Sequence, residues 1–251
     1  MRKAYISIAA LLLCGSMLMA QTPANRTAKT TAADVLAQMP AAKQAAYNKL
    51  IGDLSSTGEE GVLMLVNMIN APGKGSNANV DYALSGLTHY VMAKGEENAR
   101  LVTAKAYLKA LEMVNERETK AFIIRQLQML GKDECIEVLA SYLNDEALSG
   151  PAARALAANG SEKAGQALVA ALKMRSGSSK TQKDVIRAIA DARVKEAETL
   201  LLTLQGAADP NMQKEVLYAL SCVGGSTSLP VLAQAAENAG YTMEVTGANE
   251  A

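Results

Sequence analysis

The sequence repeats one short pattern in which a helix stops at a corner and starts again. In the stretch RALAANGSEKAGQALVAAL, Arg154 to Leu172, small and apolar residues recur at helical spacing on both sides of Asn159-Gly160-Ser161. Asn and Gly tolerate the left-handed backbone that ends a helix, and a serine can cap the helix that follows. The stretch therefore predicts a helical hairpin, two helices joined by a tight corner.

Three further stretches align with this hairpin. They begin at Arg125, Arg187 and Tyr218, so the successive starts are 29, 33 and 31 residues apart. Self-similarity at a period of about 20 to 50 residues predicts units that stack on one another as a solenoid. Asp133 and Ser226 occupy the place of Ser161 and are expected to cap their helices, whereas Val194 cannot. Hydrophobic spacing predicts six hairpins: 41–54 with 59–70, 79–93 with 96–115, 116–130 with 134–143, 149–159 with 162–175, 179–192 with 195–206, and 210–223 with 227–239.

Two of these stretches resemble a known repeat family. The spelling A-L-x-x-x-G-S-x-x-A-x-x-A-L from Ala155 to Leu168, and GSTSLPVL with Pro230 in the first turn of a helix, are similar to the short HEAT-like repeats of the phycobilin-lyase type. The resemblance implies an all-α fold, an α-solenoid of about six stacked helical hairpins in an ARM-like superhelix. In such folds the second helix of each hairpin usually lines the concave side, which would place Lys163, Gln166 and Lys173 there as partner-binding residues.

The N-terminus has the pattern of a secretory signal peptide. Arg2 and Lys3 precede an apolar run over 4–13, and small residues lead to Ala20. This predicts export to the periplasm or the medium with cleavage after Ala20, and no membrane span in the mature chain because the run is too short. A lipid anchor on Cys14 is the alternative, although a leucine stands directly before it.

The remaining chain divides by composition. Residues 21–33 are rich in Thr and Ala without an apolar period and are expected to be a flexible leader. The HEAT-like α-solenoid is expected over 34–240, and 241–251 would be the start of a further, incomplete repeat or a tail. Without Arg2 and Lys3 the chain has 25 − 2 = 23 basic against 25 acidic residues. This balance provides no basic face for nucleic acid.

Few residues suggest chemistry, and neither a cofactor nor a metal is expected. His89 is the only histidine, and it has no partner at metal-ligand or catalytic spacing. Its functional interpretation is a contact patch with Tyr82 and Tyr90 beside the irregular loop over 70–80, and the alternative is simple packing. The acidic pairs Glu59-Glu60, Glu96-Glu97 and Asp133-Glu134 each begin a helix, where the helix dipole favours negative charge without catalysis.

Three arginines share one repeat position. Arg125, Arg154 and Arg187 each lie two residues before a predicted core residue, which turns them about 200° away from the core. They form either a basic stripe for an acidic partner or a solvated face. Both interpretations place these side chains in solvent.

These observations predict an exported, non-catalytic scaffold that binds another protein or a C-terminal domain. The leader, the repeat lengths and the small-residue style also resemble the N-terminal HEAT-like region of secreted Bacteroidetes proteins that carry a 3-keto-disaccharide hydrolase (laminarinase-like) domain. That resemblance implies an accessory role in carbohydrate processing. The alternative is an enzyme or enzyme fragment that hydrolyses glycans through a catalytic domain outside this chain.

Overall fold

The computed structural model describes residues 26–93, 95, 97–174, 177–206 and 210–241, and within them the chain is all-helical with no β-strand. The all-α class is therefore as predicted. The helices are α1 (Ala28–Ala37), α2 (Gln44–Ser55), α3 (Gly58–Asn67), α4 (Ala78–Ala93), α5 (Glu97–Met113), α6 (Arg117–Leu130), α7 (Ile136–Ser141), α8 (Ser149–Asn159), α9 (Glu162–Met174), α10 (Ser179–Asp191), α11 (Glu198–Gln205), α12 (Pro210–Val223) and α13 (Leu229–Asn238), with short 3-10 turns η2 (Asp133–Cys135) and η3 (Lys195–Ala197) before α7 and α11.

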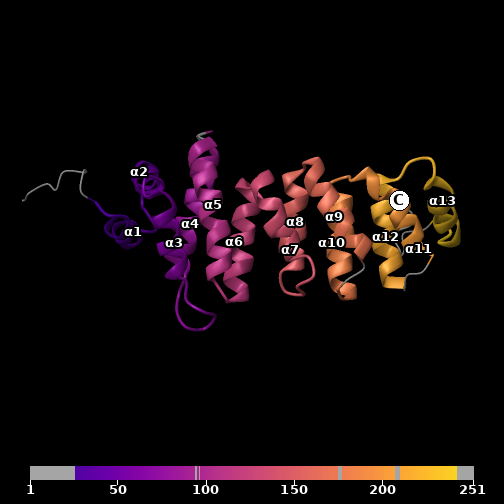
Figure 1. Cartoon of the computed structure of the whole chain (residues 1–251), viewed down its shortest axis with the longest axis horizontal. Coiled ribbons are helices and arrows are strands. Elements are labelled where there is room, and N and C mark those ends of the chain that lie inside the picture. The colour runs from indigo at the N-terminus through magenta and orange to yellow at the C-terminus, as the bar shows by residue number, and fades with distance from the viewer. Residues whose placement is uncertain (1–25, 94, 96, 175–176, 207–209, 242–251) are drawn as a thin grey trace, which may run out of the picture.

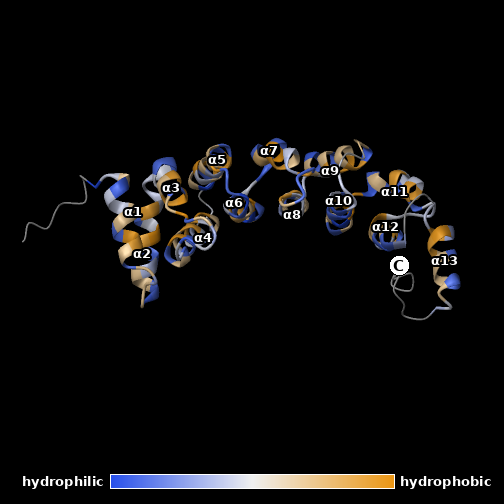
Figure 2. Cartoon of the chain, turned by 90° about the horizontal axis from the view of Figure 1, so that it is seen from below, coloured by the Kyte–Doolittle hydropathy of each residue, from blue (hydrophilic) through white to orange (hydrophobic). Residues whose placement is uncertain are grey.

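The helices lie in an elongated array with two rows. Figure 1 shows the chain passing from α1 at one end to α13 at the other. In Figure 2, the helices α4, α6, α8, α10 and α12 form one row, and α5, α7, α9 and α11 form the other. Within the first row, α6 packs on α8, α8 on α10 and α10 on α12. The second to fifth predicted hairpins thus each contribute their first helix to one row and their second helix to the other.

The array is bowed, and its inner side differs from the expectation. In Figure 2 the two ends, with α2 and α13, bend toward the row of first helices. The first helices therefore line the inner side, whereas the family resemblance predicted the second helices there. The helices of the first row approach one another closely because small side chains lie between them, and this close approach explains the curvature of the array. The buried alanines of the first row between α8 and α12 are Ala152, Ala153, Ala155, Ala188, Ala190 and Ala219.

The core lies between the two rows and repeats with the sequence. The first helices contribute Leu127, Leu156, Ile189 and Leu220, each at most 1% exposed. The second helices contribute Leu139, Leu168 and Leu201, which are equally buried. Two positions before three of the first-row residues, Arg125, Arg154 and Arg187 are exposed as predicted. The assignment of inward and outward faces from periodicity is therefore confirmed in these hairpins.

The first helix begins earlier than composition suggested. Residues 28–33 belong to α1 rather than to a flexible leader, so that part of the prediction is wrong. The hydroxyl oxygen of Thr27 accepts a hydrogen bond from the N–H of Thr30 and caps the helix. Thr31, Ala32 and Val35 are buried where α1 packs on α2 and α3. Two of these side chains are small or polar, so they gave no hydrophobic period to detect.

The corners follow the predicted chemistry only in part. Gly160 has a φ of 67°, and the Ser161 hydroxyl accepts a bond from the N–H of Ala164, so this corner is as expected. Asp133 does not cap its helix, because its carboxylate binds the side chain of Lys163 instead. Ser226 is exposed, and α13 starts after Ser228 instead. A neighbouring hairpin binds the side chain of Asp133, and capping is not the outcome at either site.

Several predictions concern residues beyond the described ranges. The signal peptide over 1–20, the lipid-anchor alternative at Cys14 and nearly all of the tail over 241–251 lie outside them. Among the helices that are described, none combines the length and the apolar character that a bilayer crossing requires.

Candidate functional site

The predicted patch on α4 is largely a helix-packing contact. The Tyr82 ring lies against the Tyr47 ring of α2, with centroids 5.4 Å apart and a tilt of 55°. The Tyr90 hydroxyl approaches Gly52 so closely that a Cβ atom there would lie 3.2 Å from it. Both tyrosines therefore face α2 and join it to α4. His89 is exposed, and its role in binding remains a prediction.

Replacement of His89 by alanine is expected to change the free energy of unfolding by no more than about 0.5 kcal/mol, as for other exposed positions. Any activity of a parent assembly should also be nearly unchanged. Urea denaturation of both proteins measures the first effect. A loss of roughly 100-fold in activity, with folding intact, would identify a general acid or base and refute the packing interpretation.

Two of the three predicted residues on α9 lie together. Gln166 and Lys173 are exposed and line one groove, whereas Lys163 lies outside it. The Nζ atom of Lys163 lies 2.9 Å from the Asp133 carboxylate and links α9 to the preceding hairpin. Lys163 therefore joins two repeats, whereas Gln166 and Lys173 face open space.

The α9 groove, as we name it, lies between α9 and the corner over 192–196. It has a volume of about 450 Å³, and its lining residues are Gly160, Ser161, Glu162, Gly165, Gln166, Val169, Ala170, Lys173, Ala192, Arg193, Val194 and Glu196. The groove is open because α9 packs on α7, α8 and α10 but makes little contact with α11. Val169 and Val194 are each 8% exposed and form an apolar floor. A volume of this order suits a small ligand or a short peptide segment.

Four charged side chains border this floor. Glu162, Lys173, Arg193 and Glu196 are all exposed, and none takes part in an ion pair within the described part of the chain. Glu162 accepts a hydrogen bond from the Gln166 side chain at 2.9 Å. The groove therefore combines an apolar floor with two negative and two positive groups that have no ion pair with any other described residue.

Arg193 adopts a backbone conformation that disfavours its side chain. Its φ is 52°, in the left-handed region, and the equivalent position one repeat earlier is Gly160 with a φ of 67°. A residue with a Cβ atom loses roughly 1 kcal/mol or more there relative to glycine. The Arg193 side chain lines the α9 groove. An arginine kept at a position that favours glycine therefore suggests a functional role for this side chain in the groove.

Changing Arg193 to glycine should raise the free energy of unfolding by roughly 0.5 to 1 kcal/mol, because relief of the strained φ exceeds the added entropy of the unfolded chain. Thermal or urea unfolding measures the effect. A destabilised Arg193→Gly protein would show instead that the arginine side chain makes a stabilising contact.

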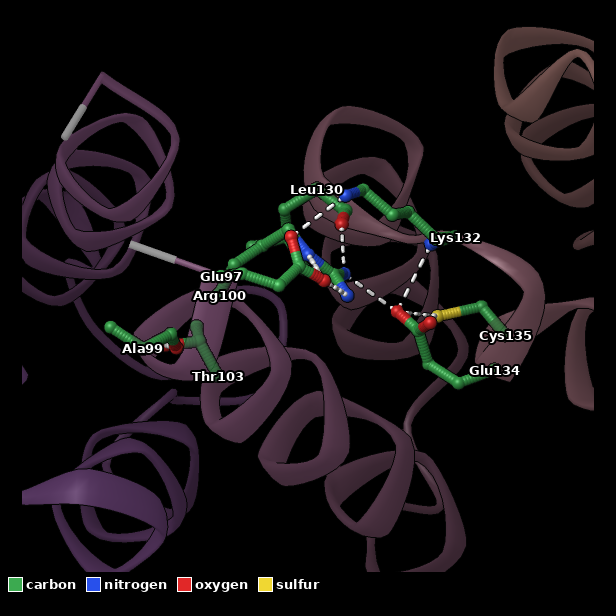
Figure 3. Close-up of polar contacts among 8 residues, drawn as sticks. All are labelled: Glu97, Ala99, Arg100, Thr103, Leu130, Lys132, Glu134 and Cys135. Atoms are coloured by element: carbon green, nitrogen blue, oxygen red, sulfur yellow. Dashed lines mark hydrogen bonds and ion pairs between the residues drawn. The ribbon is translucent and has the colours of Figure 1, made fainter. Parts of the chain in front are cut away.

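A second polar cluster is buried at the joint between two hairpins (Figure 3). The Arg100 guanidinium is 5% exposed, and Nη1 donates to the Leu130 carbonyl and to the Glu134 carboxylate, each at 2.6 Å. Nε and Nη2 donate to Glu97 at 3.0 and 2.6 Å. Lys132 adds an ion pair to Glu97 at 2.7 Å. The cluster closes the C-terminus of α6 and ties it to α5.

The charged side chains of this cluster are paired with one another, and this pairing shifts their pKa values. Hydrogen bonds from Arg100 and then from Lys132 lower the pKa of Glu97 to about 2. Burial acts to raise the pKa of Glu134, but the bonds from Arg100 and from the Lys132 N–H outweigh it, so that pKa is also lowered. Burial, followed by the Glu134 charge, raises the pKa of the Cys135 thiol to about 12. Cys135 is therefore protonated at neutral pH and is not an activated nucleophile.

The three arginines that share one repeat position, Arg125, Arg154 and Arg187, are neutralised only in part. Nε of Arg187 donates to the Glu215 carboxylate at 2.7 Å, and Nη2 donates to the other oxygen. Arg125 lines a small cavity of about 150 Å³ together with Asp81 and Glu118. Arg154 is exposed and has no ion pair within the described ranges. A continuous basic stripe is therefore not present along these helices.

Sequence reasoning missed Arg100, Arg193 and Glu196. Arg100 lies three residues after Glu97, which is an ordinary helical spacing, and only the fold brings Leu130 and Glu134 to it. Arg193 could have been found, since it aligns with the corner glycine of the preceding repeat. Within the described residues, no group of three or more His, Cys, Asp or Glu is placed to hold a metal ion.

Comparisons with known proteins add only distant similarity. No protein-family model matches the chain, and no curated protein matches it. Among solved structures, the crystal structure of an engineered protein from the Northeast Structural Genomics Consortium is 21% identical, with a TM-score of 0.40, over 77% of this chain and 97% of that one. This similarity is too low to indicate a family or a function.

Proposed function

We propose that this protein is an exported, non-catalytic scaffold, an α-solenoid of HEAT-like repeats that binds another protein or domain. The two helix rows and the regular recurrence of core positions such as Leu127, Leu156 and Ile189 support the repeat architecture. The short HEAT-like spelling around Gly160 supports the family. Stacked repeats offer extended surfaces and are commonly used for binding rather than for catalysis.

The α9 groove is the observation that carries the binding function. At two other contacts between neighbouring hairpins, charged side chains are paired, Lys163 with Asp133 and Arg187 with Glu215. In the α9 groove, the charged side chains have no ion pair within the part of the chain that the structure describes, and they stand beside an apolar floor. Such a combination suits a partner that supplies both apolar contact and complementary charge.

Site-specific cross-linking in the producing cell tests this proposal. A photoreactive amino acid replaces Ala170, an exposed alanine in the α9 groove, and in a matched control it replaces Ala158, an exposed alanine of α8 outside it. We expect a discrete adduct from position 170 and none from position 158, with the partner identified by mass spectrometry. Absence of an adduct from position 170, with the protein folded and exported, would contradict binding through this groove.

Processing of the N-terminus is a separate prediction. The mature protein should begin at Gln21 and occur in the periplasmic or extracellular fraction, because the first 20 residues have the charge and length of a signal peptide. N-terminal sequencing after cell fractionation checks it. An intact Met1 in the cytoplasm would refute export, and a lipid on Cys14 would establish the membrane-anchored alternative.

The proposed context is carbohydrate processing, with the array as an accessory to a hydrolase domain. The support is the resemblance of leader, repeat length and small-residue style to the HEAT-like regions of secreted Bacteroidetes proteins. Co-expression with the neighbouring open reading frames, followed by co-purification, tests it. A complex with a glycan hydrolase would support the accessory role, and a partner of another class would exclude it.

A further inference from the structure

Polar contacts join the second helix of a hairpin, or the turn that precedes it, to the next hairpin. Among the described residues, such a contact is present at every junction between neighbouring hairpins but one. In chain order, the contacts are Glu59 with Lys109, Arg100 with Leu130 and Glu134, Asp133 with Lys163, and Glu198 with Gly225 and Ser228. Each of them includes a charged group, so it fixes both the distance and the angle between two hairpins.

The junction between the fourth and fifth hairpins is the exception. Its corner over 192–196 carries the charged residues Arg193, Lys195 and Glu196. Within the described ranges, none of these three side chains makes a hydrogen bond or an ion pair. The helices α9 and α11 also make little contact with each other, and the α9 groove lies between α9 and this corner. The second-helix side of this junction therefore has neither a charged contact nor extensive helix packing.

A glycine in α9 accounts for the missing contact. Glu198, which joins the fifth hairpin to the sixth, lies five residues after the corner residue Arg193. The residue five positions after the corner glycine Gly160 is Gly165, which has no side chain to offer the next hairpin. Val194 packs on it instead, so that a Cβ atom at Gly165 would lie 3.3 Å from the Val194 Cγ1 atom. Apolar contact has no preferred direction, so it allows two surfaces to slide.

The first helices hold the same junction together. α8 packs on α10, and α9 also packs on α10, so the two hairpins stay in contact. The hydroxyl of Ser149, a residue with no exposed surface, donates to the Asp184 carboxylate at 2.6 Å. Lys180 adds an ion pair to the same carboxylate at 2.8 Å. One side of the junction is thus fixed and the other is not, which is the arrangement of a hinge.

We propose that the array bends at the junction between the fourth and fifth hairpins. The contact of α8 with α10, which includes the bond between Ser149 and Asp184, is the pivot. The α9 groove widens and narrows as Val194 and its corner move over Gly165. A segment bound in the groove selects one angle, so partner binding sets the curvature of the whole array. This coupling rests on the proposed partner binding, whereas the hinge itself does not.

Pulsed electron–electron resonance between two spin labels tests the hinge, because it measures the spread of distances across a junction. Genetically encoded nitroxide amino acids replace Met174 of α9 and Thr203 of α11, two exposed residues on either side of the junction. In the matched pair they replace Met174 and Ser141, an exposed residue of α7 across the junction that Asp133 and Lys163 join. We expect the broader distance distribution between positions 174 and 203. Equal widths overturn the proposal and leave partner binding through the groove standing.

An engineered disulfide closes the hinge for a second measurement. A Cβ atom at Gly165 would lie 3.9 Å from the Val194 Cβ atom, within the range of about 3.5 to 4.5 Å that a disulfide requires. In the oxidised double variant Gly165→Cys, Val194→Cys, we expect the excess width between positions 174 and 203 to be lost, and reduction should restore it. An unchanged width, with the bond verified by mass spectrometry, overturns the proposal. If the double variant does not fold, the two label pairs in the otherwise unchanged protein decide.

Discussion

Replacement of Leu156 or Leu168 by alanine should lower the free energy of unfolding by about 2 to 5 kcal/mol, as for other fully buried leucines. Both side chains have no exposed surface, and they lie at equivalent core positions of α8 and α9, on either side of the Gly160 corner. Their neighbours in the core are mostly aliphatic residues and alanines, which are expected to relax only partly into the space left. Urea or thermal denaturation measures the change.

Arg154→Ala is the matched control on the same helix. The side chain is exposed and has no ion pair within the described ranges, so its loss should cost no more than about 0.5 kcal/mol. Equal destabilisation by Arg154→Ala and Leu156→Ala would mean that the inner and outer faces of α8 are assigned wrongly.

The same substitutions should reduce cooperativity. If each hairpin touches only its neighbours, a weakened middle hairpin divides the array into blocks that unfold separately. Calorimetry of Leu156→Ala should therefore show a broadened or split transition, and hydrogen exchange should speed up first in α8 and α9. A single sharp transition shifted to lower temperature would indicate that the array unfolds as one unit.

Removal of the buried guanidinium by Arg100→Met should lower the free energy of unfolding by about 2 to 3 kcal/mol. The loss leaves the Leu130 carbonyl and the Glu134 carboxylate without their main donor at the joint of two hairpins. Methionine retains much of the apolar stem, so the substitution isolates the polar contacts. Arg100→Lys should recover only part of the loss, because an ammonium cannot donate to three acceptors in the planar geometry of the guanidinium.

The pH dependence of stability provides an independent check on this cluster. The folded pKa of Glu97 is about 2, below its ordinary value of 4.5, and that of Glu134 is also lowered. Stabilisation by these carboxylates is therefore complete above about pH 4.5 and is lost as the pH falls toward 2. The Arg100→Met protein should lose less stability over this range. Parallel acid profiles for the two proteins would show that the cluster does not stabilise the fold.

Much of the fold could be read from periodicity, because burial repeats wherever the units repeat. Leu127, Leu156 and Ile189 were placed inside and the arginines two positions earlier outside, as the structure has them. The corner at Gly160 could also be predicted, since a left-handed φ and a serine cap are local properties of the residues there. The start of α1 could not be predicted in this way, because Thr31 and Ala32 are buried by contacts with other helices and not by hydrophobic character.

The candidate site was predictable only in outline. Gln166 and Lys173 were chosen as exposed residues of one helix, which helical spacing can give. Their partners Arg193 and Glu196 come from the next hairpin, and no pattern indicated that α9 and α11 would stand apart and leave a groove. The Tyr82 and Tyr90 pair was recognised as a surface feature, although the packing of α2 on α4 makes it a structural contact.

The sequence by itself therefore determined the helices, their inward faces and the glycine corner, because these depend on residues within one or two turns of each other. Tertiary structure alone decided the direction of the bow, the burial of Arg100 and the unpaired charges of the α9 groove. Each of these depends on how closely neighbouring hairpins approach, and that distance is set by side chains about thirty residues apart in the chain. Local periodicity carries no information about such pairs.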